Sequence, residues 1–291
     1  MNYFLKKLLE FTLFFISIFL LISISINFSN NLILKNIKLK KNIKHLIIGD
    51  SRTQIFDDSI LDDCQNIAQG SESLYFSYLK LDKLLKSNQS IKNVYLGVSY
   101  HSFSSYFDEY TFNSNVVSNY FFILPYKDKI DFILNDDINI KGLIKNFFIK
   151  GVSNIVSKKK SYIGHSYIHS SDRKPTEKSI QLRISKQFTT ENSLNYSNLN
   201  ILYFDKIVEL CSKYDVELFI LNTPTHSLHH KKTPKKYINK YLDVTSNIDN
   251  HHMIRFENIL KDEMFLPDGD HINKFGANII SFKLKTFINN E

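Results

Sequence analysis

Short apolar runs alternate with helix-periodic stretches along much of the chain, and this alternation constrains the fold more than any other feature. His45–Gly49, Asn93–Ser99 and Val216–Asn222 have the length of strands, and two briefer strands are expected at Asn66–Ala68 and Met253–Phe256. Continuous apolar runs are typical of strands buried on both faces, and intervening helices are typical of parallel sheets. The alternation predicts an α/β fold, with a parallel sheet covered by helices on both faces.

The stretches between these runs have the period of amphipathic helices. In Glu72–Lys86 the apolar side chains recur at spacings of four, three and four, at Leu74, Tyr78, Leu81 and Leu85. Further helices are expected at 199–214, 235–244 and 274–288.

The alternation breaks down between residues 102 and 198, which are rich in Tyr, Phe, Ser and Asn. This stretch is too long for a loop within a compact domain. We expect a largely helical insertion, a cap or lid on the carboxyl edge of the sheet, with helices near 127–134 and 140–156. The insertion would lie within one domain spanning residues 45–288.

The N-terminal segment is apolar over Phe11–Phe28, which are 18 residues without a charge, and Lys6 and Lys7 precede them. This length is near the minimum for a membrane-spanning helix. We expect an anchor over residues 1–28 and a basic linker over 29–44; a cleaved signal peptide is the alternative. The linker lysines alone would place the body in the cytoplasm by the positive-inside rule.

Charge and cysteine content exclude some classes of protein. The net charge is +8, with basic runs near 35–44, 158–160 and 231–236, which suit a solvated surface or an anionic lipid or polymer. No nucleic-acid-binding motif accompanies them, so we expect no nucleic-acid partner. Cys64 and Cys211 are too few for a disulfide framework, and we expect both as buried free thiols.

Ser51 stands in the sequence Gly49-Asp50-Ser51, where the first strand ends and a helix is expected to begin. Sites in parallel sheets form beyond the carboxyl ends of the strands. Ser51 is therefore either a cap of that helix or a nucleophile whose oxyanion the helix N-terminus would stabilise.

A second polar motif, Leu266-Pro-Asp-Gly-Asp-His-Ile-Asn273, precedes the last expected helix. A serine nucleophile needs an imidazole base, and the base needs a carboxylate that fixes its tautomer. His271 and Asp268 supply both groups from one turn. Taken alone, the motif is equally a polar loop in which Asn273 or Asp270 caps the final helix.

The two motifs together resemble those of the SGNH (GDSL-like) hydrolases, over about residues 45–100 and 199–288. The resemblance implies a flavodoxin-like three-layer α/β/α sandwich and acyl-ester chemistry without a metal or cofactor. Ser51 would be the nucleophile, His271 the base and Asp268 its orienting carboxylate, with Asp270 as an alternative orienter.

The family also implies an oxyanion hole, which is incompletely matched. Ser51 and Gly70, in Asn66-Ile-Ala-Gln-Gly70, match two of its donors. The family's asparagine after the third strand is absent from Leu96-Gly-Val-Ser99-Tyr-His101, where Ser99 or His101 is a candidate substitute. Loss of one donor costs on the order of 100-fold in rate.

The anchor adds a resemblance to membrane-bound envelope members of this family, such as teichoic-acid D-alanylation proteins and alginate-type O-acetyltransferases. These imply an esterase or O-acyltransferase that acts outside the cytoplasm on acyl groups, with acetyl expected, of an envelope polysaccharide. The protein would be held in the bilayer through residues 11–28. A membrane acyl-donor protein is a further candidate partner. The rivals are a catalytically silent polysaccharide-binding or assembly factor and a secreted esterase.

The remaining histidines cluster at His226, His229 and His230 and at His251 and His252. Neither cluster has the acidic or cysteine partners at helical spacing that a zinc site needs, so no metal is expected. His226 follows the fourth expected strand and is a weak candidate for substrate contact.

Overall fold

The computed structural model describes residues 2–35, 39–40, 42–121, 123–134, 141–142, 144–146, 148–149, 164, 174–188, 196–249, 252–256 and 259–290. The chain divides into two compact units, residues 1–38 with 113–162, and residues 39–112 with 163–291. The helix expected over 140–156 lies mostly outside the described residues, and the basic run at 158–160 lies entirely outside them.

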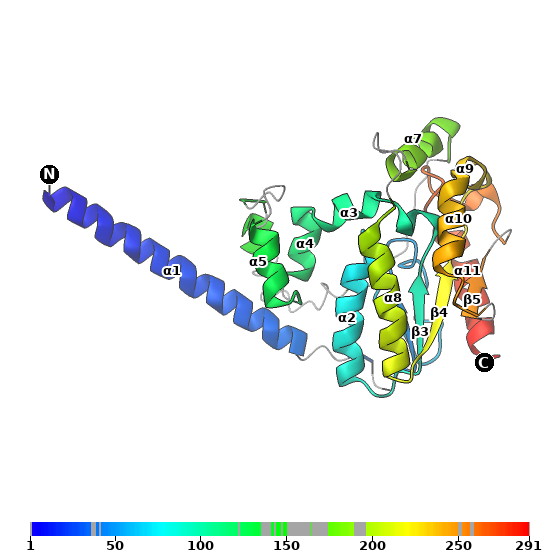
Figure 1. Ribbon diagram of the computed structural model, residues 1–291, viewed down its shortest axis with the longest axis horizontal. Coiled ribbons are helices and arrows are strands. Elements are labelled where there is room, and N and C mark those ends of the chain that lie inside the picture. The colour runs from blue at the N-terminus through cyan, green and yellow to red at the C-terminus, as the bar shows by residue number, and fades with distance from the viewer. Residues whose placement is uncertain are drawn as a thin grey trace. The chain divides into compact units, whose positions relative to one another are not determined.

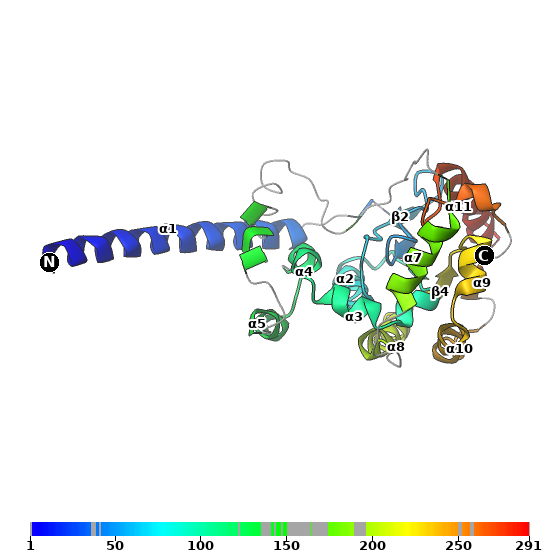
Figure 2. The same ribbon diagram turned by 90° about the horizontal axis from the view of Figure 1, so that it is seen from above.

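The first unit contains helix α1 (Asn2–Lys35), a single continuous helix (Figures 1 and 2). Within it, Tyr3–Phe28 has 26 residues and a mean hydropathy of 2.3, so it is long and apolar enough to cross a membrane. The unit also holds α4 (Ser114–Tyr120) and α5 (Tyr126–Leu134), and α5 confirms the helix expected near 127–134.

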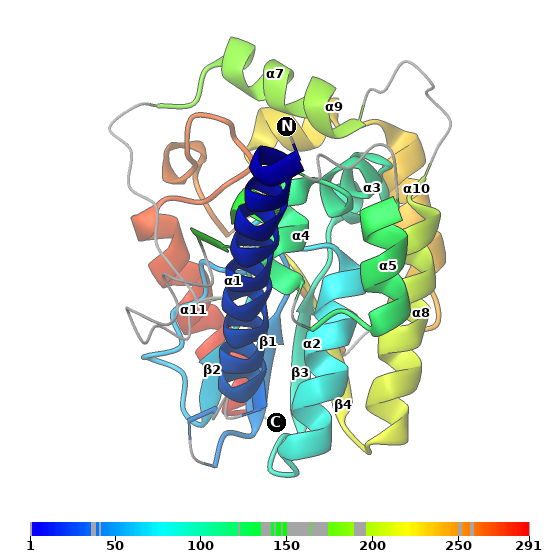
Figure 3. The same ribbon diagram turned by 90° about the vertical axis from the view of Figure 1, so that its left-hand side faces the viewer.

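The second unit contains a five-stranded, all-parallel sheet (Figure 3), which confirms the predicted α/β class. The strand order is β2-β1-β3-β4-β5. The strands are β1 (His45–Ile48), β2 (Cys64–Asn66), β3 (Asn93–Gly97), β4 (Glu217–Asn222) and β5 (Met253–Arg255).

Helices of the second unit include the four that periodicity predicted: α2 (Leu74–Ser87), α8 (Asn198–Lys213), α10 (Lys235–Val244) and α11 (Lys274–Ile288). Others were not predicted. They are the 3₁₀ helices η1 (Tyr100–Phe103) and η4 (Asp262–Met264) and the α-helices α3 (Tyr106–Thr111), α7 (Glu177–Phe188) and α9 (Ser227–Lys232).

The strands are buried on both faces. Alternate residues such as Ile47 and Tyr95 join Ile280 of α11 in one apolar core. Their neighbours Leu46 and Val94 point to the opposite face and are also fully buried. Helices α2 and α8 pack side by side, as Figures 1 and 3 show.

Strand β2 lies two residues earlier than the apolar pattern indicated. Cys64 and Asn66 pair with His45 and Ile47 of β1, whereas the expected strand was 66–68. Because Gln65 and Asn66 are polar, a search for apolar runs does not find this strand at its actual position. Asn66 is nonetheless buried, because its side chain has hydrogen-bonding partners in the neighbouring turn.

Candidate active site

Ser51, His271 and Asp268 form a continuous chain of hydrogen bonds in the second unit. Ser51 Oγ lies 2.8 Å from His271 Nε2, although the two residues are 220 positions apart in sequence. His271 Nδ1 lies 2.7 Å from Asp268 Oδ2. The structure therefore brings together all three residues that the two motifs singled out, in the order that general-base activation of a serine requires.

The loop that carries His271 is stabilised by the carboxylate of Asp268 in the same loop. Asp268 Oδ1 accepts hydrogen bonds from the backbone N–H groups of Asp270, at 3.0 Å, and His271, at 3.1 Å. Gly269 has φ of +66°, and a Cβ there would lie 2.7 Å from Ile180 Cγ1, so a larger residue would be strained as well as crowded. Asp268 consequently fixes both the backbone and the imidazole of His271.

The helix expected to begin at Ser51 is not formed, and this prediction is wrong. Residues 51–56 make consecutive turns, in which the carbonyls of Thr53 and Phe56 each accept a hydrogen bond of 2.9 Å from Asn66 Nδ2. Arg52 to Phe56 are all buried, whereas an amphipathic helix would leave one face in solvent. Ser51 is therefore not a helix cap, and no helix dipole acts at its amide.

Ser51 and Gly70, the two predicted donors of the oxyanion hole, lie close together. A Cβ added at Gly70 would lie 4.0 Å from Ser51 Cβ, so the two residues are neighbours. Within the part of the chain that the structure describes, neither amide donates a hydrogen bond. Both remain candidates for the oxyanion hole.

The two candidate substitutes for the missing asparagine have other partners. Ser99 forms a capping box with Ser102, whose Oγ accepts the Ser99 N–H at 3.0 Å. His101 Nε2 lies 3.0 Å from Asp50 Oδ2, so His101 contacts the residue directly before the nucleophile. The role of either in an oxyanion hole stays a prediction.

His101 and Asp50 form a buried neutral–anionic pair. Burial and the nearby charge of Arg52 lower the pKa of His101 despite the adjacent carboxylate of Asp50. Burial would raise the pKa of Asp50, but the hydrogen bond from His101, the positive charge of Arg52 and the hydrogen bond from the Arg52 N–H together hold that pKa below its usual value. His101 is therefore a neutral imidazole that donates its Nε2–H to the Asp50 carboxylate.

Asp270 is the centre of a second buried network that the motifs did not reveal. Its Oδ1 accepts a hydrogen bond from Arg52 Nη2, and its Oδ2 accepts from Arg183 Nε at 2.8 Å and from Gln187 Nε2 at 2.7 Å. His271 Nδ1 is 4.0 Å from Asp270 Oδ2, against 2.7 Å from Asp268. Of the two possible orienters, Asp268 is the one in hydrogen-bonding contact.

The electrostatic environment favours a protonated His271. Burial lowers its pKa, but the hydrogen bond to Asp268 and the negative charges of Asp270 and Asp268 outweigh burial and raise the pKa above 6.5. Burial would raise the pKa of Asp268, yet its bond with His271 keeps that pKa below 3.8. This arrangement would stabilise an imidazolium at His271.

Two of the clustered histidines, His226 and His229, have hydrogen-bonding partners. His226 Nδ1 accepts the Leu228 N–H at 3.1 Å and caps α9. His229 Nε2 lies 3.1 Å from Gln187 Oε1, and burial lowers the pKa of His229 to about 4. His251 lies outside the described residues. The contact of His226 with substrate stays a prediction.

A metal ion does not fit the one group of possible ligands found among the described residues. Ligand atoms of Asp268, Asp270 and His271 lie within 4.8 Å of one another. Both oxygens of Asp270 already accept hydrogen bonds from guanidinium groups of Arg52 and Arg183, whose positive charges would repel a cation.

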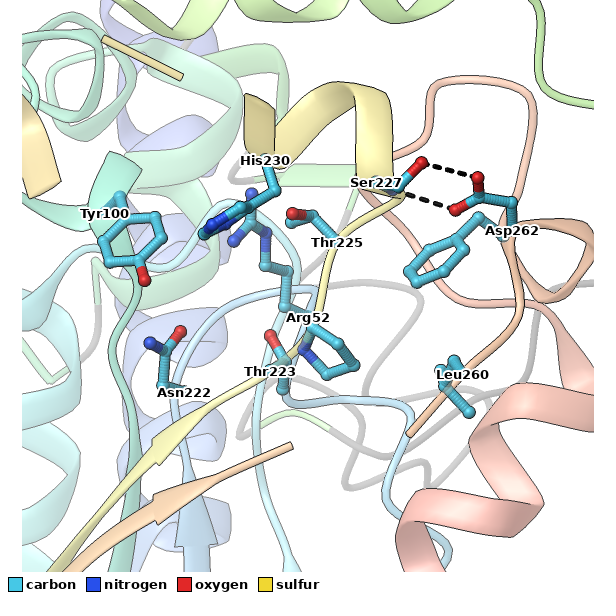
Figure 4. Close-up of a pocket in the computed structure, with 11 residues that line it drawn as sticks. Arg52, Tyr100, Asn222, Thr223, Thr225, Ser227, His230, Leu260 and Asp262 are labelled. Atoms are coloured by element: carbon cyan, nitrogen blue, oxygen red, sulfur yellow. Dashed lines mark hydrogen bonds between the residues drawn. The ribbon is translucent and has the colours of Figure 1, made fainter. Parts of the chain in front are cut away.

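A cavity of about 220 Å³ lies at the carboxyl end of β4, beside Arg52 (Figure 4). Tyr100, Asn222 and Thr223 point polar groups into it, as the close-up shows. Arg52 Nε and Thr223 Oγ1 are buried without a partner in the described structure. Its lining also includes Pro224, Thr225, Ser227, His230, Leu260, Asp262 and Phe265. The cavity thus offers hydrogen-bond donors and acceptors beside an apolar wall.

No protein-family model matches the chain, and no curated protein gives a significant match to it. The relationship to the SGNH hydrolases therefore stays a proposal, supported by the two motifs and by the geometry that joins them.

Proposed function

We propose that this chain is a membrane-anchored serine esterase or O-acyltransferase of the SGNH type. The observation that carries the proposal is the hydrogen-bonded series Ser51–His271–Asp268, with distances of 2.8 and 2.7 Å. The three groups come from two loops that follow β1 and precede α11, so the whole fold is needed to bring them together.

The chemistry follows from these positions. Ser51 Oγ attacks the carbonyl carbon of an ester while its proton passes to His271 Nε2, and Asp268 stabilises the imidazolium. The amides of Ser51 and Gly70 would donate to the developing oxyanion. The leaving alcohol takes the proton from Nε2. Water or an acceptor hydroxyl then attacks the acyl-enzyme and gives its proton to Nε2; the bond between the acyl carbon and Ser51 Oγ breaks, Nε2 returns the proton to Oγ, and the acid or the new ester leaves.

The strand order supports a finer description of the fold. An order of 2-1-3-4-5 in an all-parallel sheet is that of flavodoxin-like proteins, whose sites lie at the carboxyl edge. Burial of both faces of the strands supports a three-layer α/β/α sandwich.

The cavity beside Arg52 supports a hydroxyl-bearing substrate. Side-chain hydroxyls of Tyr100, Thr223 and Thr225 and the amide of Asn222 both donate and accept, which suits sugar hydroxyls better than an anion. The positive charge of Arg52 is already balanced by Asp270. Ser51 and His271 do not line this cavity, so it supports a hydroxyl-bearing group only beside the proposed triad. We propose from the family resemblance that the acylated polymer is an envelope polysaccharide.

Helix α1 supports retention at a membrane. We propose from the family resemblance alone that the second unit lies outside the cytoplasm and that an acyl-donor protein is a partner in the bilayer. A C-terminal alkaline-phosphatase fusion tests the orientation, because this enzyme is active only outside the cytoplasm of bacteria. An active fusion is expected. Inactivity in intact cells, with full-length fusion protein present, would contradict the outward placement.

The reaction class is tested with the full-length protein in detergent, treated with a fluorophosphonate probe and with p-nitrophenyl acetate. Ser51→Ala should abolish labelling and lower turnover by about 10⁴-fold or more. Ser59→Ala, an exposed serine of the same segment, is the matched control and should react as the wild type does. Equal signal from wild type and Ser51→Ala would overturn the proposal and favour a catalytically silent binding factor.

A further inference from the structure

Arg52 and Asp270 are each covalently adjacent to a residue of the proposed triad. Arg52 directly follows the nucleophile Ser51, and Asp270 directly precedes the base His271. The guanidinium of Arg52 donates to Asp270 Oδ1 across 218 positions of sequence. Because adjacent residues share a peptide plane, this contact restrains the backbone positions from which both reacting side chains project.

The pair is buried and its carboxylate is fully occupied. The side chains of Arg52 and Asp270 are 3% and 0% exposed. The second oxygen of Asp270 accepts from Arg183 and Gln187, which stand one helical turn apart on α7. Helix α7 thus contributes two side chains that complete the link between the loops of Ser51 and His271.

This arrangement does not make Asp270 a reacting group. Its nearest oxygen is 4.0 Å from His271 Nδ1, where Asp268 already binds. A purely stabilising role is also a weak explanation, since well-packed apolar side chains commonly stabilise a core as well as a buried ion pair does. What the ion pair adds is a fixed geometry between two loops that are distant in sequence.

We propose that Arg52 and Asp270 are positioning residues, whose buried ion pair, completed by Arg183 of α7, holds Ser51 and His271 within hydrogen-bonding distance. The proposal rests on the proposed function, because it assigns these residues to the reaction of Ser51. The expected result of breaking the link is a slower acylation of Ser51 with little change in KM, since small displacements of reacting groups cost about 100-fold in rate.

The test compares full-length Asp270→Asn and Arg183→Gln with wild type, by the rate of fluorophosphonate labelling and by its dependence on pH. The charged groups that act on the imidazole of His271 are Asp268, Asp270 and Arg183. Removal of Asp270 lowers the pKa of His271, so the acidic limb of the rate profile should move to lower pH. Removal of Arg183 raises the pKa of His271, so the acidic limb should move to higher pH.

Two controls separate positioning from general destabilisation. Glu72→Gln breaks another buried ion pair, with Lys80, and should leave the acidic limb where it is. Glu177→Gln changes an exposed residue of α7 and should leave both rate and limb unchanged. Wild-type labelling rates in Asp270→Asn and Arg183→Gln, or acidic limbs that stay in place as in Glu72→Gln, would overturn the proposal.

A readout that does not need activity keeps this proposal distinct from the proposed function. The proton between His271 Nδ1 and Asp268 gives a downfield NMR resonance, which should shift or broaden in Asp270→Asn and stay unchanged in Glu177→Gln. If wild type and Ser51→Ala label equally, the proposed function fails, while this resonance still tests the positioning. An unchanged resonance in Asp270→Asn would refute it. If Asp270→Asn does not fold, Arg183→Gln replaces it in this measurement, because the Arg183 side chain is 20% exposed. This variant should also shift or broaden the resonance.

Discussion

Two ion pairs in the second unit are equally buried but connect very different parts of the chain. Lys80 and Glu72 are 3% and 0% exposed and 2.6 Å apart, and they lie eight residues apart in sequence. Arg52 and Asp270 have the same exposures, yet 218 residues separate them.

The local pair belongs to one loop and the helix that follows it. Lys80 also donates to the carbonyl of Ile67 at 2.6 Å, and Glu72 accepts from the Ser77 hydroxyl at 2.6 Å. These contacts form when α2 packs on its own preceding loop. The distant pair forms only when β1, α7 and the loop before α11 have all assembled. The pair Lys80–Glu72 therefore stabilises one local segment, whereas the pair Arg52–Asp270 joins loops that are distant in sequence.

Loss of a single charge from either pair is expected to have the largest effect on stability. The effect should be of similar size at both pairs. Glu72→Gln and Asp270→Asn should each lower the free energy of unfolding by about 3–5 kcal/mol, because the partner is left charged and buried. Urea unfolding followed by circular dichroism measures this change. A loss below about 1 kcal/mol at either site would show that water reaches the remaining charge.

Replacement of a whole ion pair by apolar residues should distinguish the two pairs by their effect on activity. Glu72→Leu with Lys80→Met is expected to restore the free energy of unfolding to within about 2 kcal/mol of wild type, with esterase activity retained. Arg52→Met with Asp270→Leu and Arg183→Met should restore stability similarly but leave acylation about 100-fold slow. Full activity in the triple variant would remove the distinction between the pairs.

The contributions of the two pairs to stability should also change at opposite ends of the pH scale. Burial would raise the pKa of Asp270, but Arg52 and Arg183 hold it well below 3.8. Its stabilisation is therefore present above pH 3.8 and is lost as the pH falls through the folded-state pKa, with a slope of up to about 1.4 kcal/mol per pH unit. Asp270→Asn should flatten this acid-side slope in urea titrations.

Lys80 has the reverse dependence. Burial lowers its pKa below 10.5 despite Glu72, so the unfolded chain binds more protons between the folded-state pKa and 10.5. Stability contributed by this group should rise with pH in that alkaline window. Lys80→Met should abolish the rise, and an unaltered alkaline profile would indicate that another group is responsible.

The smallest effect is expected at an exposed ion pair between α7 and α9. Glu177 of α7 and Lys232 of α9 lie 2.7 Å apart at the surface, where solvent screens their attraction. Lys232→Met removes this contact of α7 and should change neither unfolding nor labelling measurably, whereas Arg183→Gln, which removes the contact of α7 with Asp270, should change labelling. A comparable effect of both would mean that α7 acts through its stability rather than through Arg183.

The sequence predicted the sheet and the triad because both depend on local patterns. Apolar runs located β1, β3 and β4, and two short motifs identified Ser51, Asp268 and His271. The turn after β1 was mistaken for a helix because its hydrogen-bonding partner, Asn66, comes from another strand. Tertiary contacts of this kind override local periodicity.

The network around Asp270 could not be predicted in the same way. Arg52 and Asp270 lie beside the motifs, but nothing in their local sequence indicates that they meet. Arg183 comes from α7, which has few buried side chains, Ile180, Gln187 and Phe188, and so lacks a clear apolar stripe. The family resemblance implied a role for Asp270 only as an alternative orienter.

The turn that presents Ser51 also rests directly on the smallest residue of the sheet. A Cβ at Gly97 of β3 would overlap Thr53, which packs over it from that turn. For protein engineering, Gly97 is thus a size limit, because any side chain there would push the turn that carries Ser51 outward. Thr53 Oγ1 is the atom that such a side chain would meet first, so Thr53→Ala, which removes it, is the substitution that gives this turn room to settle closer to the sheet.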